Sequence, residues 1–253
     1  MRLNIDLNCD LGESFGVYQM GQDADILPWI TSANIACAFH AGDPSVMKRT
    51  VKACVQHEIH IGAHPGLPDL QGFGRREMQV TAEEVYDMIV YQVGALRAFV
   101  QIEGARLHHV KPHGALYNMA ARQPELAAAV AAAVYDVDRE LVLYGLAGSE
   151  LIEQGRKRGL RVAREIFADR MYEDDGALTP RSLPGAVIHD AQQAISQVMS
   201  ILERKEVMSR RGLVVPLEAD TVCVHGDNEQ ALVFVQGLHQ GLTEAGLLVK
   251  GEK

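Results

Sequence analysis

Acidic, amide, basic and imidazole side chains recur in this sequence where short, apolar, strand-like runs end. Asp6, Asn8 and Asp10 alternate with apolar residues in the first run, and Lys111 and His113 follow a later one. Carboxylates and a histidine suit general acid and base catalysis, and a lysine can offset the charge of an oxyanion or a phosphate. We therefore expect an enzyme whose site is built from the ends of several strands.

Polar residues stand at or just past the carboxyl ends of most of the predicted strands. They are Asp6, Asn8, Asp10, Asn34, His40, His64, Lys111, His113, Glu165, Asp169, His225 and Asp227. A solvent-facing strand would give the same alternation around Asp6 and Asp10, but parallel strands are usually covered on both faces. We therefore favour a functional role for both carboxylates.

Two histidines stand in turn-rich loops after successive strand-like runs. His40 lies in the segment Phe39–Pro44, and His64 lies in Gly62–Gly66. Imidazole is the commonest metal ligand, and Asp10, His40 and His64 would hold a divalent metal through three protein ligands. Their spacing matches no recognised metal signature, and a lone loop histidine is usually a solvated surface residue. The metal site is therefore a hypothesis about these three residues.

A glycine-rich loop at residues 71–76 contains Arg75 and Arg76, whose guanidinium groups can fork onto a carboxylate or a phosphate. A solvated, charged loop would have the same composition. The segment 165–184 is a second long connection that could close over a site. Neither GxxxxGK[ST] nor GxGxxG occurs, so a nucleotide would have to be held without these motifs.

Alternation of strand-like and helical patterns predicts an α/β protein of parallel strands joined by helices. Seven strands are expected, at Leu3–Asn8, Ala33–Ala38, His60–Ala63, Leu107–Lys111, Leu141–Tyr144, Arg161–Ile166 and Thr221–Val224, with an additional candidate at Leu213–Leu217. Thr81 and Glu84 form a capping-box pattern before a helix that runs to about Gly104. The size favours a single closed β/α barrel over residues 1–253, with a doubly wound open sheet as the alternative.

Composition excludes several classes of protein. The chain has 253 residues with 47% hydrophobic and 23% charged residues and a formal net charge of −9, which argues against a nucleic-acid partner. The longest apolar stretch, residues 126–135, is far shorter than the roughly 20 residues of a membrane span. The beginning of the chain lacks the apolar core of a signal peptide, and the four cysteines show no CxxC spacing. We expect a cytoplasmic protein with no membrane partner.

Six ordered motifs together resemble the LamB/YcsF family, the A subunits of 5-oxoprolinase. They are Asp6–Glu13, Ser32–Asp43, Gly62–Pro65, His109–Gly114, Phe167–Arg170 and Val224–Asp227. The resemblance covers about residues 2–245. Cys9 and Ala38 depart from it, because residues such as Ala and Gly are expected there, and Met171 follows the Asp-Arg pair.

The resemblance implies a barrel similar to that of the glycoside hydrolase/deacetylase superfamily. It further implies opening of 5-oxo-L-proline to L-glutamate with ATP as co-substrate, in a complex with subunits B and C. On this basis the expected catalytic residues are Asp6, Asp10, Lys111, His113, Asp169 and Asp227, and the expected substrate-binding residues are Asn8, Asn34, Arg75, Glu165, Arg170 and His225. A divalent metal on Asp10, His40 and His64 is the associated cofactor hypothesis.

Two other functions fit the same residues. An ATP-independent, metal-dependent amidohydrolase or deacetylase would use the histidine and aspartate positions. A non-catalytic subunit would capture a small acid for partner enzymes. Loss of activity to chelators without an ATP requirement would favour the first, and saturable binding without a separate effect of mutations on turnover would favour the second.

Overall fold

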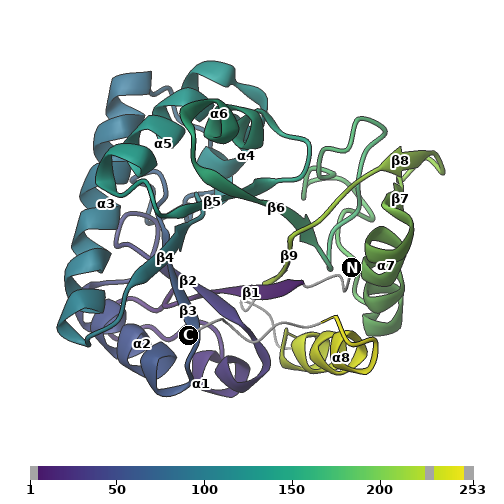
Figure 1. Ribbon diagram of the computed structural model, residues 1–253, viewed down its shortest axis with the longest axis horizontal. Coiled ribbons are helices and arrows are strands. Elements are labelled where there is room, and N and C mark those ends of the chain that lie inside the picture. Colours follow the sequence, from purple (N-terminus) through teal and green to yellow (C-terminus); the bar gives the residue numbers. More distant parts are fainter. Residues whose placement is uncertain (1–4, 226–230, 248–253) are drawn as a thin grey trace.

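Parallel strands close into a seven-stranded barrel in the computed structural model, which describes residues 5–225 and 231–247 (Figure 1). The barrel strands are β1 (Asp6–Leu11), β2 (Ser32–Ala36), β3 (His60–His64), β4 (Leu107–Val110), β5 (Val142–Leu146), β6 (Arg161–Phe167) and β9 (Thr221–His225). Strand β9 pairs with both β6 and β1, and this closes the ring. The predicted β/α barrel is confirmed, and the alternative of an open sheet is wrong.

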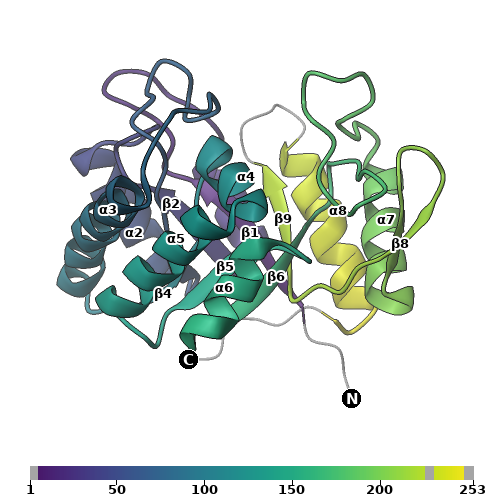
Figure 2. The ribbon, with the colours of Figure 1, turned by 90° about the horizontal axis from the view of Figure 1, so that it is seen from above.

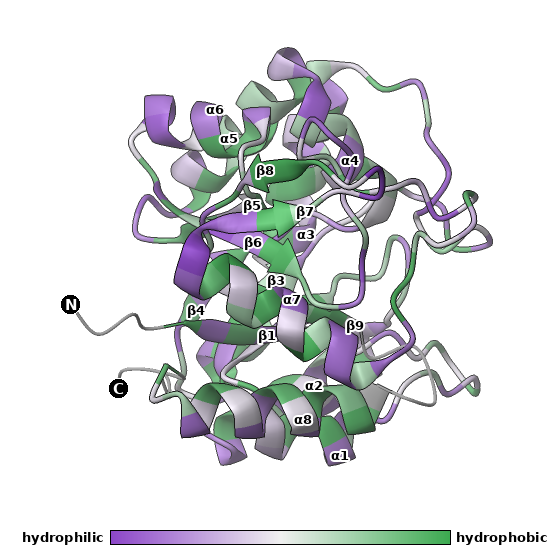
Figure 3. Cartoon of the chain, turned by 90° about the vertical axis from the view of Figure 1, so that its right-hand side faces the viewer, coloured by the Kyte–Doolittle hydropathy of each residue, from purple (hydrophilic) through white to green (hydrophobic). Residues whose placement is uncertain are grey.

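The additional strand expected at 213–217 exists but lies outside the barrel. It is β8 (Val214–Pro216), which pairs antiparallel with β7 (Glu206–Met208) in a two-stranded sheet. Figure 3 shows both strands as largely hydrophobic segments. The chain thus makes a short excursion between α7 and the last barrel strand.

Helices surround the ring of strands (Figure 1). They are α1 (Asp23–Ile26), α2 (Pro44–Gln56), α3 (Ala82–Ile102), α4 (Gly114–Arg122), α5 (Pro124–Val137), α6 (Glu150–Arg158), α7 (Ala191–Arg204) and α8 (Ala231–Glu244), with the 3-10 helix η1 (Leu27–Trp29) after α1. The predicted capping box is confirmed, since Thr81 Oγ1 accepts from the Glu84 N–H and Glu84 accepts from the Thr81 N–H. Within the described residues, no helix is both long and apolar enough to cross a membrane.

Strand β1 separates an apolar layer from a polar interior. In β1, Leu7, Cys9 and Leu11 belong to the hydrophobic core. Asn8 and Asp10 alternate with them and bond to residues of other barrel strands across the interior. Asn8 is completely buried, so the alternation does not come from a solvent-facing strand.

Strand β1 begins later than predicted, and this moves Asp6 away from the site. Asp6 is the first residue of β1, whereas Asp10 is near its carboxyl end. The Asp6 carboxylate accepts hydrogen bonds from Thr31, Ser32, Thr221 and Tyr144. The expected position of Asp6 at the carboxyl rim is therefore wrong, because the apolar run was placed three residues too early.

Long connections project at one end of the barrel (Figure 2).

Candidate active site and metal centre

A cavity of about 410 Å³ lies where strand ends and the following loops meet. Asp10, Glu13, His64, Lys111 and His113 line its polar floor. Its outer wall includes Arg75, Arg122, Arg170, Arg181 and Glu77. This is the carboxyl end of a β/α barrel, where active sites of such barrels are built. The cavity therefore brings six of the predicted site residues together.

Lys111 directly follows β4 and is almost completely buried between two carboxylates. Its Nζ lies 2.9 Å from Asp10 Oδ1 and 2.9 Å from Glu165 Oε1, and it also donates to Cys223 Sγ at 3.0 Å. Burial alone would lower the pKa of Lys111, but the neighbouring Asp10, Cys223 and Glu165 outweigh burial and raise it well above its usual value. The lysine is thus a permanent ammonium that fixes one oxygen of Asp10.

Glu165 of β6 holds the far side of this ammonium. Its Oε1 also accepts from Asn8 Nδ2 at 3.0 Å, and its Oε2 accepts from the Tyr117 hydroxyl at 2.7 Å. Burial and the charge of Glu165 raise the pKa of Tyr117 well above its usual value, so the hydroxyl remains a donor. In this structure Glu165 therefore orients Lys111 and Asn8, although we expected it to contact the substrate.

The two carboxylate oxygens of Asp10 contact different neighbours. Oδ1 accepts from Lys111 and from Asn34 Nδ2 at 2.8 Å. Oδ2 lies 3.3 Å from His64 Nε2, at the edge of the cavity. One oxygen is therefore held by fixed donors, and the other faces the imidazoles.

The lone pairs of two imidazoles face each other across a short gap. His64 Nδ1 lies 2.7 Å from the carbonyl oxygen of Lys111, and His113 Nε2 lies 2.8 Å from that of Phe73. A carbonyl oxygen only accepts, so each of these nitrogens must donate its hydrogen. In neutral rings, His64 Nε2 and His113 Nδ1 then both carry lone pairs, although they are 3.0 Å apart. A cation bound by both nitrogens would remove this repulsion.

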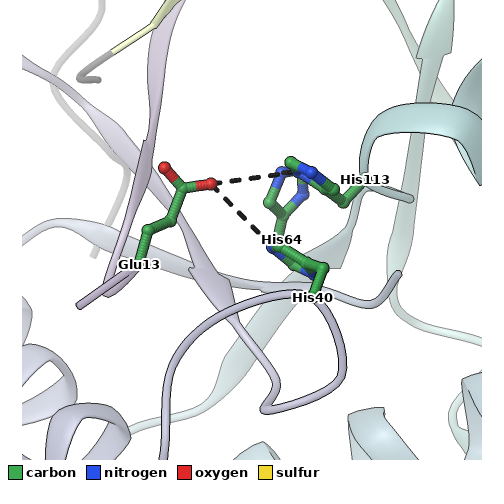
Figure 4. Close-up of side chains that lie close together, drawn as sticks. All are labelled: Glu13, His40, His64 and His113. Carbon is green, nitrogen blue, oxygen red and sulfur yellow. Dashed lines mark hydrogen bonds and ion pairs between the residues drawn. The ribbon is translucent and has the colours of Figure 1, made fainter. Parts of the chain in front are cut away.

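His40 and Glu13 complete the group. Within the described part of the chain, both ring nitrogens of the buried His40 lack a hydrogen-bond partner. Glu13 Oε1 lies 3.8 Å from His40 Nε2 and 3.9 Å from His113 Nδ1 (Figure 4). One ligand atom from each of Glu13, His40, His64 and His113 lies within 4.8 Å of the others. This buried cluster could bind a metal ion.

The electrostatics of the cluster suit a metal ligand set. Burial lowers the pKa of His40 well below its usual value, and the nearby His113 and His64 lower it further. Burial and His64 likewise lower the pKa of His113. Both rings are therefore neutral near pH 7, which is the form that binds metals. The hydrogen bonds from His64 and His113 to carbonyl oxygens resemble those that orient metal-bound histidines.

Loop backbone brings the imidazoles together. His40 stacks on His113 with ring centroids 3.7 Å apart. Gly74 lies against both rings with φ +62°, and a Cβ there would come within 2.7 Å of His40 Cβ. Ala38, which stands where the family resemblance led us to expect glycine, adopts φ +71° in the loop that carries His40. The histidine stack therefore depends on backbone that favours glycine.

Four guanidinium groups, those of Arg75, Arg122, Arg170 and Arg181, line the outer cavity. Arg170 is buried, and its side chain donates to the carbonyl oxygens of Ala186 and Thr179. Burial, together with repulsion from Arg181 and Arg75, lowers the pKa of Arg170 to about 10. Because the group still carries its charge at neutral pH, this wall suits an anionic group of a substrate.

The structure brings most of the predicted residues together. Asp10, Lys111, His113, Arg75, Arg170 and His64 line the cavity, with Asn8, Asn34 and Glu165 buried beside it. Asp169 is buried just after β6 but is not among the lining residues, and Asp6 lies at the opposite end of β1. The His225 side chain and Asp227 lie outside the described residues.

The structure places two of the three residues of the predicted metal triad in this cluster. His40 and His64 belong to the buried cluster, but their companions are Glu13 and His113, with Asp10 beside them and bonded to Lys111. Sequence reasoning missed Glu13, although it follows β1 by two residues. A carboxylate just past a strand end was the available signal.

Comparison with known proteins identifies the family of the chain. A model of the LamB/YcsF family matches residues 5–252. The chain belongs to this family. Among its relatives is a Geobacillus kaustophilus protein, 59% identical over 98% of this chain and 97% of that protein, which is named as the A subunit of 5-oxoprolinase. A Bacillus subtilis protein of the same name is 56% identical over 97% of this chain and 95% of its own length.

A solved structure shows the same LamB/YcsF architecture. The lactam utilization protein from Thermus thermophilus is 44% identical and superposes with a TM-score of 0.93, covering 99% of this chain and all of the other. The family resemblance read from six motifs is therefore confirmed over nearly the whole sequence.

Proposed function

We propose that this chain is the A subunit of a 5-oxoprolinase, a hydrolase that opens 5-oxo-L-proline to L-glutamate. The observation that carries the proposal is the name of the relatives, which are 56–59% identical over nearly their full lengths. In the proposed reaction, ATP hydrolysis to ADP and phosphate drives cleavage of the ring C–N bond, and subunits B and C take part. Water supplies the oxygen of the new carboxylate and the hydrogen that the leaving nitrogen gains.

Asp10 is the residue that we assign to activation of the attacking water. Its Oδ1 is held by Lys111 and Asn34, so its Oδ2 has a fixed direction beside His64 at the cavity. A carboxylate held in this way can accept a proton from water without reorganising its surroundings. The assignment follows from the unequal use of its two oxygens.

Lys111 and Arg75 would offset negative charge that develops on the lactam oxygen or on a phosphoryl group. Lys111 lies on the floor of the cavity, and Arg75 lies on its wall. Fixed positive charge in a water-excluded site stabilises such an anion more strongly than it would in water. Arg170 would hold the substrate carboxylate, and Asn8 and Asn34 would act from beside the cavity through their bonds to Glu165 and Asp10.

The group that protonates the leaving nitrogen is assigned by elimination between two candidates. His113 uses its Nε2 to donate to the Phe73 carbonyl oxygen, and its Nδ1 belongs to the imidazole cluster. These bonds favour a ligand role for His113. Asp227 is therefore our preferred proton donor, although it lies outside the described residues. Asp169, buried next to Arg170, would position that guanidinium.

Glu13, His40, His64 and His113 would hold a divalent metal in this proposal. The orphaned nitrogens of His40 and the opposed lone pairs of His64 and His113 fit such an ion. A metal there would supply Lewis-acid polarisation of a carbonyl oxygen.

Metal binding can be measured without an activity assay. The chain would be stripped with a chelator, equilibrated with Zn²⁺ and freed of excess ion, and its bound metal would be determined by elemental analysis. We expect one ion per chain, and its loss in His40→Ala. The exposed His57 provides the control His57→Ala, which should keep the ion. Equal metal content in all three proteins, or none in the wild type, would overturn the site.

Glutamate formation tests the proposed function. It would be measured with ATP and 5-oxoproline, first with the purified chain and then with co-expressed candidate partner subunits. We expect activity only with the partners, and its loss in Asp10→Asn and His64→Ala. Wild-type turnover in both variants would refute the residue assignments, and no activity with folded, bound partners would refute the function.

The imidazole cluster favours one second candidate, a metal-dependent amidohydrolase that needs no ATP. Under this alternative, ring opening or deacylation by the chain alone would persist without nucleotide and would disappear when metal is removed. The same assay distinguishes the two functions if ATP is omitted in parallel.

A further inference from the structure

A buried histidine inside the barrel lies one residue away from direct contact with Asp10. His109 of β4 is completely buried, and its Nε2 is 2.7 Å from Asn34 Oδ1. Asn34 in turn donates from Nδ2 to Asp10 Oδ1 at 2.8 Å and to Asn8 Oδ1 at 2.7 Å. His109 is not among the residues that line the cavity, so it would act on Asp10 only through Asn34.

Asp10 determines the direction of the hydrogen bonds that link it through Asn34 to His109. A carboxylate oxygen can only accept, so the Asn34 amide must turn its NH₂ group toward Asp10. The Asn34 carbonyl oxygen then faces His109, whose Nε2 must carry the hydrogen. Burial lowers the pKa of His109 well below its usual value, which keeps the ring neutral with a single N–H. His109 Nδ1 is therefore an acceptor, and it lies 3.1 Å from His108 Nδ1.

Packing holds the His109 ring where its Nε2 meets Asn34. One face stacks on Tyr144, with ring centroids 4.1 Å apart and an interplanar angle of 14°. Gly62 of β3 is paired in register with His109, and a Cβ at Gly62 would lie 2.0 Å from His109 Nε2. Because residue 62 has no side chain, there is room for the His109 Nε2–H beside Asn34.

We propose that His109, as the neutral Nε2–H tautomer, is a positioning residue that fixes the Asn34 amide and through it the carboxylate of Asp10. This inference rests on the proposed function, in which Asp10 activates water. Without the His109 donor, the buried Asn34 oxygen would lose its hydrogen bond. The amide would then shift toward another donor and weaken its bond to Asp10 Oδ1, so Asp10 would lose its fixed direction.

Two substitutions at residue 109 separate the donor from the bulk of the ring. Glutamine can place an amide N–H near the position of Nε2, whereas methionine fills similar space without a donor. In the assembled complex we expect His109→Met to lower kcat on the order of 10- to 100-fold with little change in KM, as second-layer partners of active-site groups do. His109→Gln should restore most of kcat. Equal kcat in the two variants would overturn the proposal.

The matched control is His57→Gln, because His57 is exposed at the end of α2. It should keep the wild-type kcat and KM. Urea unfolding of each variant shows whether a loss of turnover reflects a loss of folded protein. If His109→Met does not fold, the tautomer measurement below tests the proposal on the wild-type chain.

Nitrogen-15 NMR of histidine-labelled protein reads the tautomer directly and needs no activity. The His109 signals, identified by their loss in His109→Gln, should show a neutral ring protonated at Nε2 near pH 7. A neutral ring protonated at Nδ1, or a charged ring, would overturn the proposal even if the enzyme is active. An inactive wild-type complex with the expected tautomer would instead refute the proposed function and leave the hydrogen-bond chain established.

Discussion

At the scale of single residues, the interior of this barrel is unusual because it buries an ammonium between two carboxylates. Lys111 is held by Asp10 and Glu165, and its raised pKa keeps it charged throughout the neutral range. Removing such charges from water is costly, and the attraction between them compensates only when all partners are present. The stability of the protein should therefore fall when any one of Lys111, Asp10 and Glu165 is lost.

Replacement of Lys111 by methionine tests this dependence. Lys111→Met would leave Asp10 and Glu165 buried without their cation, and we expect a loss of about 3–5 kcal/mol in the free energy of unfolding. Urea denaturation at pH 7 measures the change. Lys157→Met on the exposed surface of α6 is the control and should change stability by about 0.5 kcal/mol or less.

A double variant makes the cause specific. Adding Glu165→Gln to Lys111→Met removes one of the two stranded carboxylates, so part of the lost stability should return. If the double variant is as unstable as the sum of its single changes, charge pairing is not the source of the effect.

At the scale of elements, the loops that follow the strands place the site, and backbone at positive φ shapes them. Gly42 ends the loop that carries His40, with φ +77°. A Cβ at Gly42 would lie 2.9 Å from the Gly12 carbonyl oxygen and 3.0 Å from that of Ala36. The loops after β1 and β2 therefore approach each other at a point where no side chain fits.

Two glycine substitutions separate backbone strain from collision. Gly104 has φ +72° and open space around it, so Gly104→Ala should cost only the left-handed conformation, about 1–2 kcal/mol. Gly42→Ala should lower the free energy of unfolding by the same amount and by about 1–3 kcal/mol more, because backbone oxygens must move. Thermal and urea unfolding would compare the two variants, and equal losses would show that the collision is relieved without cost.

At the scale of the whole molecule, the two ends of the barrel have different tasks. The carboxyl end carries the cavity, and the opposite end is tied together by Asp6. Its carboxylate accepts from Thr31 and Ser32 beside β1, from Thr221 of β9 and from Tyr144 of β5. One side chain thus links strands that are distant in the sequence where the ring closes.

Asp6→Asn tests whether Asp6 closes the barrel or takes part in catalysis. The amide has one acceptor oxygen in place of two and adds donors that face hydroxyl groups. We expect a loss of about 1–3 kcal/mol in unfolding free energy, with kcat of the folded complex largely retained. A collapse of kcat at unchanged stability would restore the catalytic role that the sequence suggested.

Local patterns were sufficient for the elements and for the location of the site. Apolar runs marked the seven barrel strands, and the capping pattern at Thr81 marked the beginning of α3. The polar residues after these runs pointed to the carboxyl end of a barrel, because all parallel strands end on the same side. The error at Asp6 arose because an alternating pattern does not show where pairing with the neighbouring strands begins.

The sequence by itself determined the class of fold, the family and the rim on which the polar residues gather, since these follow from periodicity and ordered motifs. Only the tertiary structure decided which partners each residue has. His40 and His64 join Glu13 and His113 because loops distant in sequence meet over the barrel, and the Nε2–H of His109 meets Asn34 because Gly62 leaves room. Such contacts depend on strand register and ring closure, which no local pattern encodes.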